Sequence, residues 1–217
     1  NKDIYFLVEN KVPMNSNPER VQVYIDGFNL YFGMTTRLKG IKWLNIYALS
    51  QNLLKPDQTL IGVKYFTSRV SNHPAKEKRQ RTYLDAINTT GTEIIYGHYK
   101  SNRTLCNRCG HSWAGNEEKM TDVNIAVHLL TDALEDTYDT ALLISGDSDL
   151  VPSILAVHSK FPHKRVIVGF PPERHNNSVR NVAKGSFIIG RNSLVNAQFP
   201  NVITLVNGFQ ISRPAEW

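Results

Sequence analysis

The stretch Ala141-Leu-Leu-Ile-Ser-Gly-Asp-Ser-Asp-Leu150 decides the fold, because a short apolar strand in it runs straight into a polar turn. That turn carries two aspartates, Asp147 and Asp149, separated by one residue. In an open parallel α/β sheet, ligands bind in the crevice outside the carboxyl ends of the strands. The stretch therefore predicts an α/β fold with a functional site at one edge of its sheet.

A second junction of the same kind lies earlier in the chain. The strand-like run Val21-Gln-Val-Tyr-Ile25 ends in Asp26-Gly-Phe-Asn-Leu30. If the two strands are neighbours, the carboxylates of Asp26 and Asp147 converge. Neither aspartate precedes an obvious helix that it would cap, and Gly146 indicates a close backbone approach at the second turn. We therefore interpret the pair as functional rather than structural.

Strand and helix patterns alternate along the chain from Val21. Strands are expected at 21–25, 61–67, 93–99, 140–145 and 165–170, and helices at 44–54, 74–88, 122–134 and 150–159, followed by a helix at 177–184 and short strands at 187–189 and 202–206. This alternation is typical of right-handed βαβ units and a parallel sheet flanked by helices. With 217 residues, of which 41% are hydrophobic, we expect one domain over residues 21–217, after an extension over residues 1–20. Residues 98–119 are expected to form an irregular, Cys- and His-containing loop insertion.

The expected helix at 122–134 has two candidate features. Its core stripe is predicted from apolar residues at helical spacing, with Thr121 as the N-cap: Val123, Ala126, Val127, Leu130 and Leu134. Asp122 then lies in the first turn, where it either complements the helix dipole or points into the crevice beside Asp26 and Asp147. Asp149 has a similar structural alternative, as the N-cap of the helix at 150–159.

Charge and cysteine content narrow the class of partner. The net charge of +6 and the sequence pI of about 9.3 favour a negatively charged partner such as nucleic acid, although a modest positive excess also serves solubility. The two cysteines are too few for a secreted disulfide framework and fit a reducing compartment, so a cytoplasmic protein is expected. We expect no contact with a membrane, because no segment approaches the ~18 consecutive apolar residues of a membrane helix.

Clustered carboxylates predict a divalent metal, because three or four of them repel one another unless a cation neutralises their charge. Oxygen ligands suit Mg²⁺ or Mn²⁺, which also take phosphate oxygens from a substrate. One or two such ions favour hydrolysis of a phosphodiester bond.

Three segments carry a resemblance to a known family. Asp26-Gly-Phe-Asn29, Glu118-Lys119-Met-Thr-Asp122 and Ser145-Gly-Asp-Ser-Asp149 together resemble the motifs of the NYN domains, PIN-like bacterial ribonucleases related to LabA-type proteins. The resemblance implies a Rossmannoid, PIN-like fold and metal-dependent endoribonuclease activity. It places Asp26, Asp122, Asp147 and Asp149 at the acidic metal positions, Asn29 and Ser145 as groups that orient water or substrate, and Lys119 at the basic position before the helix acid.

Two groups of basic residues offer a path for a single-stranded RNA. The first group follows one strand and the next helix, with His73, Tyr65, Phe66 and Tyr83 interleaved: Lys64, Arg69, Lys76, Lys78, Arg79 and Arg81. The second lies beyond the strand at 165–170: Arg174, His175, Arg180, Lys184 and Arg191. Cations would meet phosphates, and exposed rings would stack on unpaired bases. The alternative for the first group is an ordinary solvated helix face.

The insertion contains half of a zinc-binding pattern. Cys106 and Cys109 form a single CxxC pair with His98 and His111 nearby, whereas a structural zinc site normally has four ligands. A polar loop with two reduced thiols remains the alternative.

Other functions stay open. An NYN-like scaffold that holds RNA or a protein partner without efficient catalysis differs from a nuclease only in turnover. A phosphatase or nucleotide-binding enzyme is less favoured, because the chain has no Gly-x-Gly-x-x-Gly after the first strand and no Walker lysine loop. The choice between RNA and DNA and the oligomeric state are not decided by the sequence.

Overall fold

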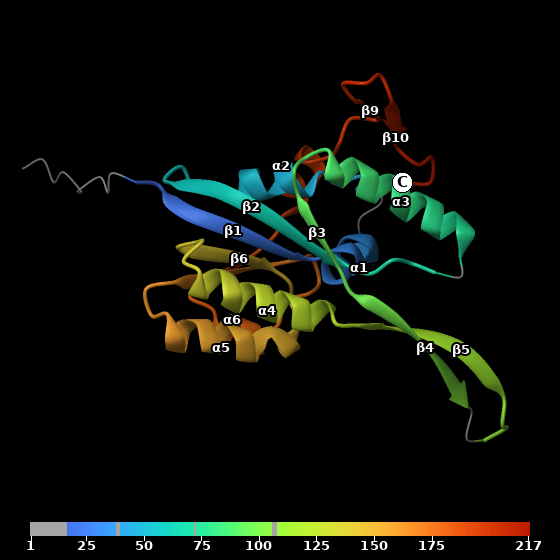
Figure 1. The fold of residues 1–217 in the computed structure, drawn as a ribbon, viewed down its shortest axis with the longest axis horizontal. Helices are drawn as coiled ribbons and strands as arrows, with labels where there is room; N and C mark the ends of the chain where they lie inside the picture. Colours follow the sequence, from blue (N-terminus) through green and yellow to red (C-terminus); the bar gives the residue numbers. More distant parts are fainter. Residues whose placement is uncertain (1–16, 38–39, 72, 106–107) are drawn as a thin grey trace, which may run out of the picture.

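The computed structural model describes residues 17–37, 40–71, 73–105 and 108–217 (Figure 1). Most of the expected N-terminal extension therefore lies outside the described residues. Glu19 and Arg20, which we had counted in that extension, already belong to the first strand. Within the described part of the chain, none of the helices is both long and apolar enough to cross a lipid bilayer.

The core of the structure is a six-stranded sheet with the order β3-β2-β1-β6-β7-β8. Its strands are β1 (Glu19–Asp26), β2 (Gln58–Thr67), β3 (Glu93–Tyr96), β6 (Thr140–Ile144), β7 (Arg165–Phe170) and β8 (Gly185–Ile188). All neighbouring strands pair in parallel. The chain first builds outward from β1 to β3, then returns to place β6 on the other side of β1. The strand order therefore reverses between β1 and β6, which is the point where sheets of this kind bind ligands.

Helices cover both faces of the sheet, as the alternating pattern predicts (Figure 1). They are α1 (Gly27–Arg37), α2 (Ile46–Leu53), α3 (Pro74–Asn88), α4 (Thr121–Leu134), α5 (Val151–Lys160), α6 (Asn177–Val182) and α7 (Arg191–Asn196). Successive residues of β1 point to opposite faces, so Val23 joins the core beneath α2 and α3, and Tyr24 joins the core beneath α4 and α5. Because both faces are covered, β6 and β7 contain continuous apolar runs. The predicted α/β fold with a parallel sheet is confirmed.

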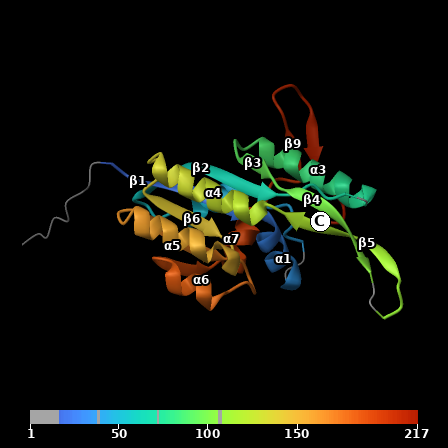
Figure 2. The same cartoon turned by 60° about the horizontal axis from the view of Figure 1, so that its bottom comes forward.

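The insertion at 98–119 is not an irregular loop, as we had expected, but a two-stranded antiparallel ribbon. It consists of β4 (His98–Leu105) and β5 (Ser112–Lys119), paired in register from His98 opposite Lys119 to Leu105 opposite Ser112. The expected strand at 93–99 divides at Gly97, whose N–H bonds to the carbonyl of Thr67. Pairing between the two strands satisfies the backbone groups that face each other, and water can satisfy those on the outer edges, so a polar sequence can form such a ribbon. Figures 1 and 2 show the ribbon extending away from the sheet.

Helix α4 turns a different face to the sheet from the one expected. Its buried residues are Thr121, Ile125, Leu129, Asp132 and Ala133. The predicted stripe is wrong at three of its five positions, because Val123, Val127 and Leu134 are exposed by 60%, 55% and 73%. Met120, with a left-handed φ of 80°, occupies the N-cap position that we had assigned to Thr121.

A buried polar network explains that rotation of α4. Asp132 accepts a hydrogen bond from the Tyr24 hydroxyl at 2.6 Å and forms an ion pair with the Lys64 Nζ at 2.7 Å. The Lys64 Nζ also lies 3.2 Å from His128 Nδ1. A buried carboxylate is tolerated only when it is paired and hydrogen-bonded, and strands β1 and β2 supply both partners. Asp132 therefore faces the sheet, and the helix turns with it.

A C-terminal hairpin completes the described chain. It is formed by β9 (Val202–Thr204) and β10 (Gln210–Ser212), which pair antiparallel. The strand expected at 202–206 ends earlier, and neither β10 nor helix α7 had been expected. Ile211 and the nearby Phe199 join the core on the α2 and α3 side of the sheet.

Candidate functional site

The two junctions that stand out in the sequence lie side by side in the structure. Ile25 of β1 is opposite Ile144 of β6, so the residues that follow, Asp26 and Ser145, lie side by side at the carboxyl edge of the sheet. The Ser145 hydroxyl donates a hydrogen bond to Asp26 Oδ2 at 2.9 Å, and both residues are buried. The expectation that the two strands are neighbours is confirmed.

Asp26 also has a capping role that the sequence had not revealed. It immediately precedes α1, a helix that we had not expected, and its Oδ1 accepts a hydrogen bond from the backbone N–H of Asn29 at 2.9 Å. The Asn29 side chain in turn accepts a bond from the Gly146 N–H at 3.0 Å. The start of α1 is thus tied to the turn after β6.

Asp147 likewise caps a helical turn, contrary to our interpretation of it as free of such a role. It is the N-cap of the short 3₁₀ helix η1 (Ser148–Leu150), and its Oδ1 accepts from the Asp149 N–H at 2.9 Å. Its own N–H donates to the Ser145 hydroxyl at 3.1 Å. A carboxylate has about four lone-pair positions, so one capping bond leaves room for other ligands. Capping and metal binding are compatible at both aspartates.

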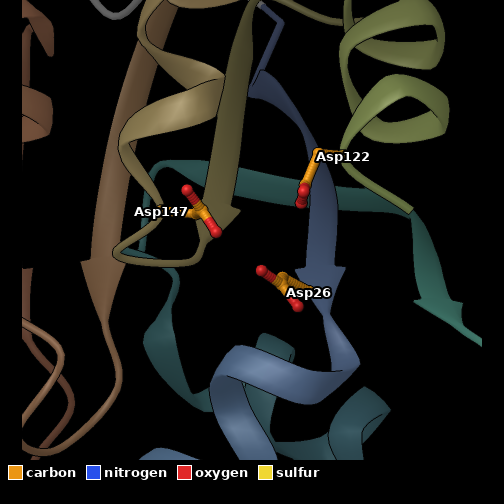
Figure 3. A group of neighbouring side chains, drawn as sticks. All are labelled: Asp26, Asp122 and Asp147. Atoms are coloured by element: carbon orange, nitrogen blue, oxygen red, sulfur yellow. The ribbon is translucent and has the colours of Figure 1, made fainter. Parts of the chain in front are cut away.

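Three carboxylates converge at this edge of the sheet (Figure 3). Asp26, Asp122 and Asp147 each offer one oxygen, and these oxygens lie within 4.8 Å of one another. Asp122 comes from the first turn of α4, so it is both close to the positive end of that helix and part of the cluster. The donor set consists of oxygen alone, which fits a hard divalent cation such as Mg²⁺ or Mn²⁺ and does not favour softer metals.

The remaining residues of the expected acidic site stand apart from this cluster. Asp149 is exposed and does not belong to the group of three. Nor does it cap α5, whose N-cap is Leu150. Lys119 ends β5 two residues before α4 begins, and its side chain lies outside the described part of the structure.

A pocket of about 190 Å³ opens over the three carboxylates. Its lining residues are Asp26, Phe28, Asn29, Phe32, Asp122, Asp147 and Arg174. A larger pocket of about 430 Å³ lies at the opposite edge of the sheet, near Val21, Thr140 and Arg165. We assign the site to the smaller pocket, because it lies at the carboxyl ends of β1 and β6, where the strand order reverses. The sequence analysis had not assigned Phe28 and Phe32 to the site, although they lie shortly after Asp26 and four residues apart, which is a helical spacing.

Arg174 reaches the pocket because two glycines leave room for its loop. A Cβ at Gly146 would lie 1.8 Å from the Arg174 carbonyl oxygen. A Cβ at Gly33 of α1 would lie 2.7 Å from Pro171 Cβ and 3.2 Å from Arg174 Cγ. The close backbone approach expected at Gly146 is therefore confirmed, and the group that approaches it is the loop after β7.

A buried hydroxyl lies beneath the site. Burial raises the pKa of Tyr65 above its ordinary value, and the negative charge of Asp26 acts in the same direction, although a hydrogen bond with Thr67 partly opposes them. Tyr65 therefore remains a neutral neighbour of Asp26 over the physiological pH range.

The first basic group is less available to a ligand than the sequence suggests. Lys64 is paired with Asp132, and Tyr65, Phe66 and Tyr83 are buried, so these rings cannot stack on bases. The remaining cations differ in their contacts. Arg79 pairs with Glu216 at 3.3 Å, Arg69 lies 4.8 Å from the centre of the Tyr96 ring, and Lys76 and Arg81 are exposed. In the second group, Arg180 is exposed on α6, and Arg174 lines the pocket.

The zinc prediction stays a prediction. Cys106 and the side chain of His98 lie outside what the structure describes, while Cys109 and His111 are exposed near the tip of the ribbon.

Comparisons with known proteins bear on the fold and on the family of this chain. A solved structure of VPA0982, a protein of unknown function from Vibrio parahaemolyticus, matches with a TM-score of 0.59 and 18% identity, over 82% of this chain and 96% of that chain. At that identity the match shows the fold alone. In sequence, the chain is 25% identical over 193 residues to 6-hydroxy-3-succinoylpyridine 3-monooxygenase HspA of Pseudomonas putida. That match covers 72% of this chain and spans 60% of the length of HspA.

The family model gives the broader result. The model of the NYN domain matches residues 20–193, which include β1 from its second residue on, the three converging aspartates and Arg174. The chain therefore belongs to the NYN domain family.

Proposed function

We propose that the chain is a metal-dependent endoribonuclease that hydrolyses phosphodiester bonds of RNA at the Asp26, Asp122 and Asp147 cluster. The observation that carries the proposal is the convergence of three carboxylate oxygens within 4.8 Å at the point where the strand order reverses. Membership of the NYN family, a nuclease-like family, supports it independently.

Asp26, Asp122 and Asp147 would hold Mg²⁺ or Mn²⁺ through oxygen ligands. Such an ion, when bound, lowers the pKa of a coordinated water and neutralises charge on the phosphate. The protein contributes the placement of its ligands. Ser145 fixes Asp26 Oδ2, and the Asn29 N–H fixes Asp26 Oδ1, so this carboxylate has a defined orientation before any ion arrives. We assign Asn29 and Ser145 mainly to this positioning, and Arg174 to contact with a phosphate of the substrate.

A cleavage assay tests the proposal. Labelled single-stranded RNA, duplex RNA and single-stranded DNA are incubated with Mg²⁺, Mn²⁺ or EDTA. The proposal expects RNA cleavage with either metal and none with EDTA. Asp147→Asn should abolish RNA cleavage, because it removes a charged ligand of the metal. Asparagine is also a good N-cap, so the fold should survive the substitution. Asp85→Asn, at an exposed position of α3, is the matched control. Undiminished cleavage by Asp147→Asn would contradict the proposal.

The same assay separates two other functions. Binding of RNA without turnover would indicate a scaffold that holds RNA or presents it to a partner. A second candidate follows from HspA, which is named as a monooxygenase acting on a substituted pyridine. Phe28, Phe32 and Arg174 in the pocket would also suit a flat aromatic acid. Oxygen uptake with 6-hydroxy-3-succinoylpyridine and a reduced nicotinamide, in place of RNA cleavage, would favour that activity.

A further inference from the structure

Helix α1 exposes an aromatic face next to the acidic pocket. Phe28, Tyr31 and Phe32 recur at the i, i+3 and i+4 spacing that places side chains on one side of a helix. Tyr31 is 38% exposed and Phe32 is 50% exposed. The rings of Phe28 and Phe32 are stacked with centroids 6.4 Å apart, and the Tyr31 ring meets Phe32 edge-on at 5.5 Å.

This face is distinct from the side of α1 that packs into the core. Leu30 and Met34, four residues apart, are buried against the sheet and anchor the helix. The aromatic rings are therefore not needed to fill the interior. Exposed rings grouped on one face generally mark a binding surface, because isolated exposure is common but a contiguous patch is not.

Two cations lie over the exposed rings. The Arg174 guanidinium carbon is 6.0 Å from the centre of the Phe32 ring, and the Lys42 Nζ is 5.8 Å from the centre of the Tyr31 ring. The Nε of Arg174 is shielded from solvent and has no hydrogen-bond partner among the described residues. A ligand that combines flat aromatic groups with negative charge would complement both the rings and the cations.

The aromatic face is continuous with the carboxylate cluster. Phe28, Phe32 and Arg174 line the same pocket as Asp26, Asp122 and Asp147. Figure 3 shows α1 following directly from Asp26 at the edge of the cluster. A strand with one phosphate at the carboxylates would therefore present its adjoining nucleotide to α1.

We propose that Phe28, Tyr31 and Phe32 form a stacking subsite for unpaired bases next to the phosphate held at the acidic pocket, with Arg174 and Lys42 meeting the neighbouring phosphates. The proposal rests on RNA being the substrate and makes single-stranded RNA the preferred form. Bases in a duplex are stacked on one another and offer no free face to a protein ring, whereas an unpaired base can lie flat on one.

Binding measured in EDTA, where no strand is cut, tests this subsite separately from catalysis. The probe is a short single-stranded RNA with 2-aminopurine at one position, whose fluorescence falls when the base stacks. The wild-type chain should quench it. Phe32→Leu should weaken the quenching, and it should weaken the binding by about 5-fold to 150-fold, the range for loss of one stacked base. Leucine keeps an apolar side chain on an exposed helix position, so folding should survive, and circular dichroism checks this. Phe209→Leu, which changes an exposed phenylalanine near the C-terminal hairpin, is the matched control.

Salt dependence separates the role of the rings from that of the cations. Phe32→Leu should leave the slope of log affinity against log salt unchanged, because no phosphate contact is lost. Arg174→Gln should lower that slope by roughly 0.7 for a single strand. Tyr31→Leu provides a second ring variant. An RNA with an abasic nucleotide at the probe position should bind the wild-type chain as weakly as intact RNA binds Phe32→Leu.

The outcomes distinguish the subsite from the proposed nuclease. Equal affinity for intact and abasic RNA, equal affinity for duplex and single strand, or no RNA binding at all would each overturn the stacking subsite, even if metal-dependent cleavage is observed. Quenching that depends on Phe32 would support the stacking subsite even if no cleavage occurs. In that case only the proposed nuclease activity would be contradicted.

Discussion

The carbonyl oxygen of Arg174 occupies the space that a side chain at position 146 would need, since a Cβ on Gly146 would lie 1.8 Å from it. This contact joins the loop after β7 to the turn after β6. The same turn is held from its other side by Asn29, whose side chain accepts a bond from the Gly146 N–H. One glycine therefore links α1, the acidic turn and the arginine loop.

Gly146→Ala should disturb this link. The new methyl group must push the Arg174 backbone away, and overpacking of this kind typically costs about 1–3 kcal/mol of unfolding free energy. The displaced loop should also weaken RNA binding. Thermal and urea unfolding measure the loss. Gly190→Ala is the control, because a Cβ there meets no atom within 4 Å. Gly190 is the N-cap of α7, where alanine is less favourable than glycine, so this substitution should cost about 0.5 kcal/mol of unfolding free energy. Equal effects of the two substitutions would contradict the close approach.

Asp26→Asn and Asp147→Asn should separate metal binding from folding. Each asparagine keeps a side-chain oxygen for its capping bond but removes one of three crowded negative charges. In EDTA the melting temperature should stay equal or rise, with about 1 kcal/mol gained from relieved repulsion. Mg²⁺ should raise the melting temperature of the wild-type chain and not of the variants. RNA cleavage should fall by orders of magnitude.

A large drop in melting temperature in EDTA would instead assign a structural role to these aspartates. Full cleavage by both variants would rule out a nuclease whose metal is held by Asp26 and Asp147.

Asp149→Asn provides a sharper test of the cluster. The family resemblance implies a fourth acidic ligand at this position, whereas the structure leaves Asp149 exposed and outside the group of three. We therefore expect Asp149→Asn to keep the melting-temperature increase caused by Mg²⁺, unlike Asp147→Asn two residues earlier. Loss of that increase in Asp149→Asn would show that the metal site includes a fourth carboxylate.

The sheet and the acidic edge could be predicted because their signals are local. A central strand of a parallel sheet is buried on both faces, so it appears as an uninterrupted apolar run such as Ala141–Ile144. The polar residue that ends such a run must lie at the carboxyl edge. One run ends in Asp26, and the other ends at Ser145, two residues before Asp147. These two runs were enough to predict that acidic side chains meet at this edge, because the strands are neighbours.

The orientation of α4 could not be predicted because its cause lies elsewhere in the chain. The helix has apolar residues on two sides, and periodicity alone favours the side with Val123 and Val127. The partners that allow Asp132 to be buried, Tyr24 and Lys64, come from strands 108 and 68 residues away. No local pattern reports such a pairing.

Helix α1 escaped notice for a different reason. Its cap is Asp26, and assigning this residue to chemistry removed the one signal that a helix begins there. The two roles coincide at a single carboxylate. The aromatic residues of α1 then read as part of a loop, although Leu30 and Met34 already have the spacing of a buried helix face.

Paired substitutions on α4 would check the orientation of that helix. Leu129 is fully buried, and Leu129→Ala should cost about 2–5 kcal/mol of unfolding free energy. Val127, two residues earlier, is more than half exposed, and Val127→Ala should change the unfolding free energy by less than about 0.5 kcal/mol. Urea unfolding of the two variants measures the difference. The reverse order of effects would restore the face predicted from periodicity.

His158 should make the stability of the protein depend on pH in the mildly acidic range. It lies in the last turn of α5, where its Nε2 accepts a hydrogen bond from the Val166 N–H at 3.1 Å. Burial lowers the pKa of His158 below its ordinary value of 6.5, and the positive charge of Lys184 lowers it further, although a backbone bond near Val182 opposes them. The neutral ring is the form that can accept the bond from Val166.

The direction of the effect follows from proton binding. Between pH 6.5 and the lowered pKa of the folded state, the unfolded chain binds a proton at His158 that the folded chain does not. The unfolding free energy should therefore fall as the pH drops below about 6.5, the ordinary pKa of a histidine, and recover above it. His158→Gln, which keeps an acceptor but cannot titrate, should flatten this dependence. The carboxylates of Asp136 and Asp139 do not contribute to the pH dependence in this range. Lys164 lowers the pKa of Asp136 from 3.8, and Arg20 lowers the pKa of Asp139 from the same value. Their effect on stability therefore begins only at more acidic pH. Urea unfolding of both proteins between about pH 7.5 and pH 5 measures the difference, and an equal decline in the variant would show that another group is responsible.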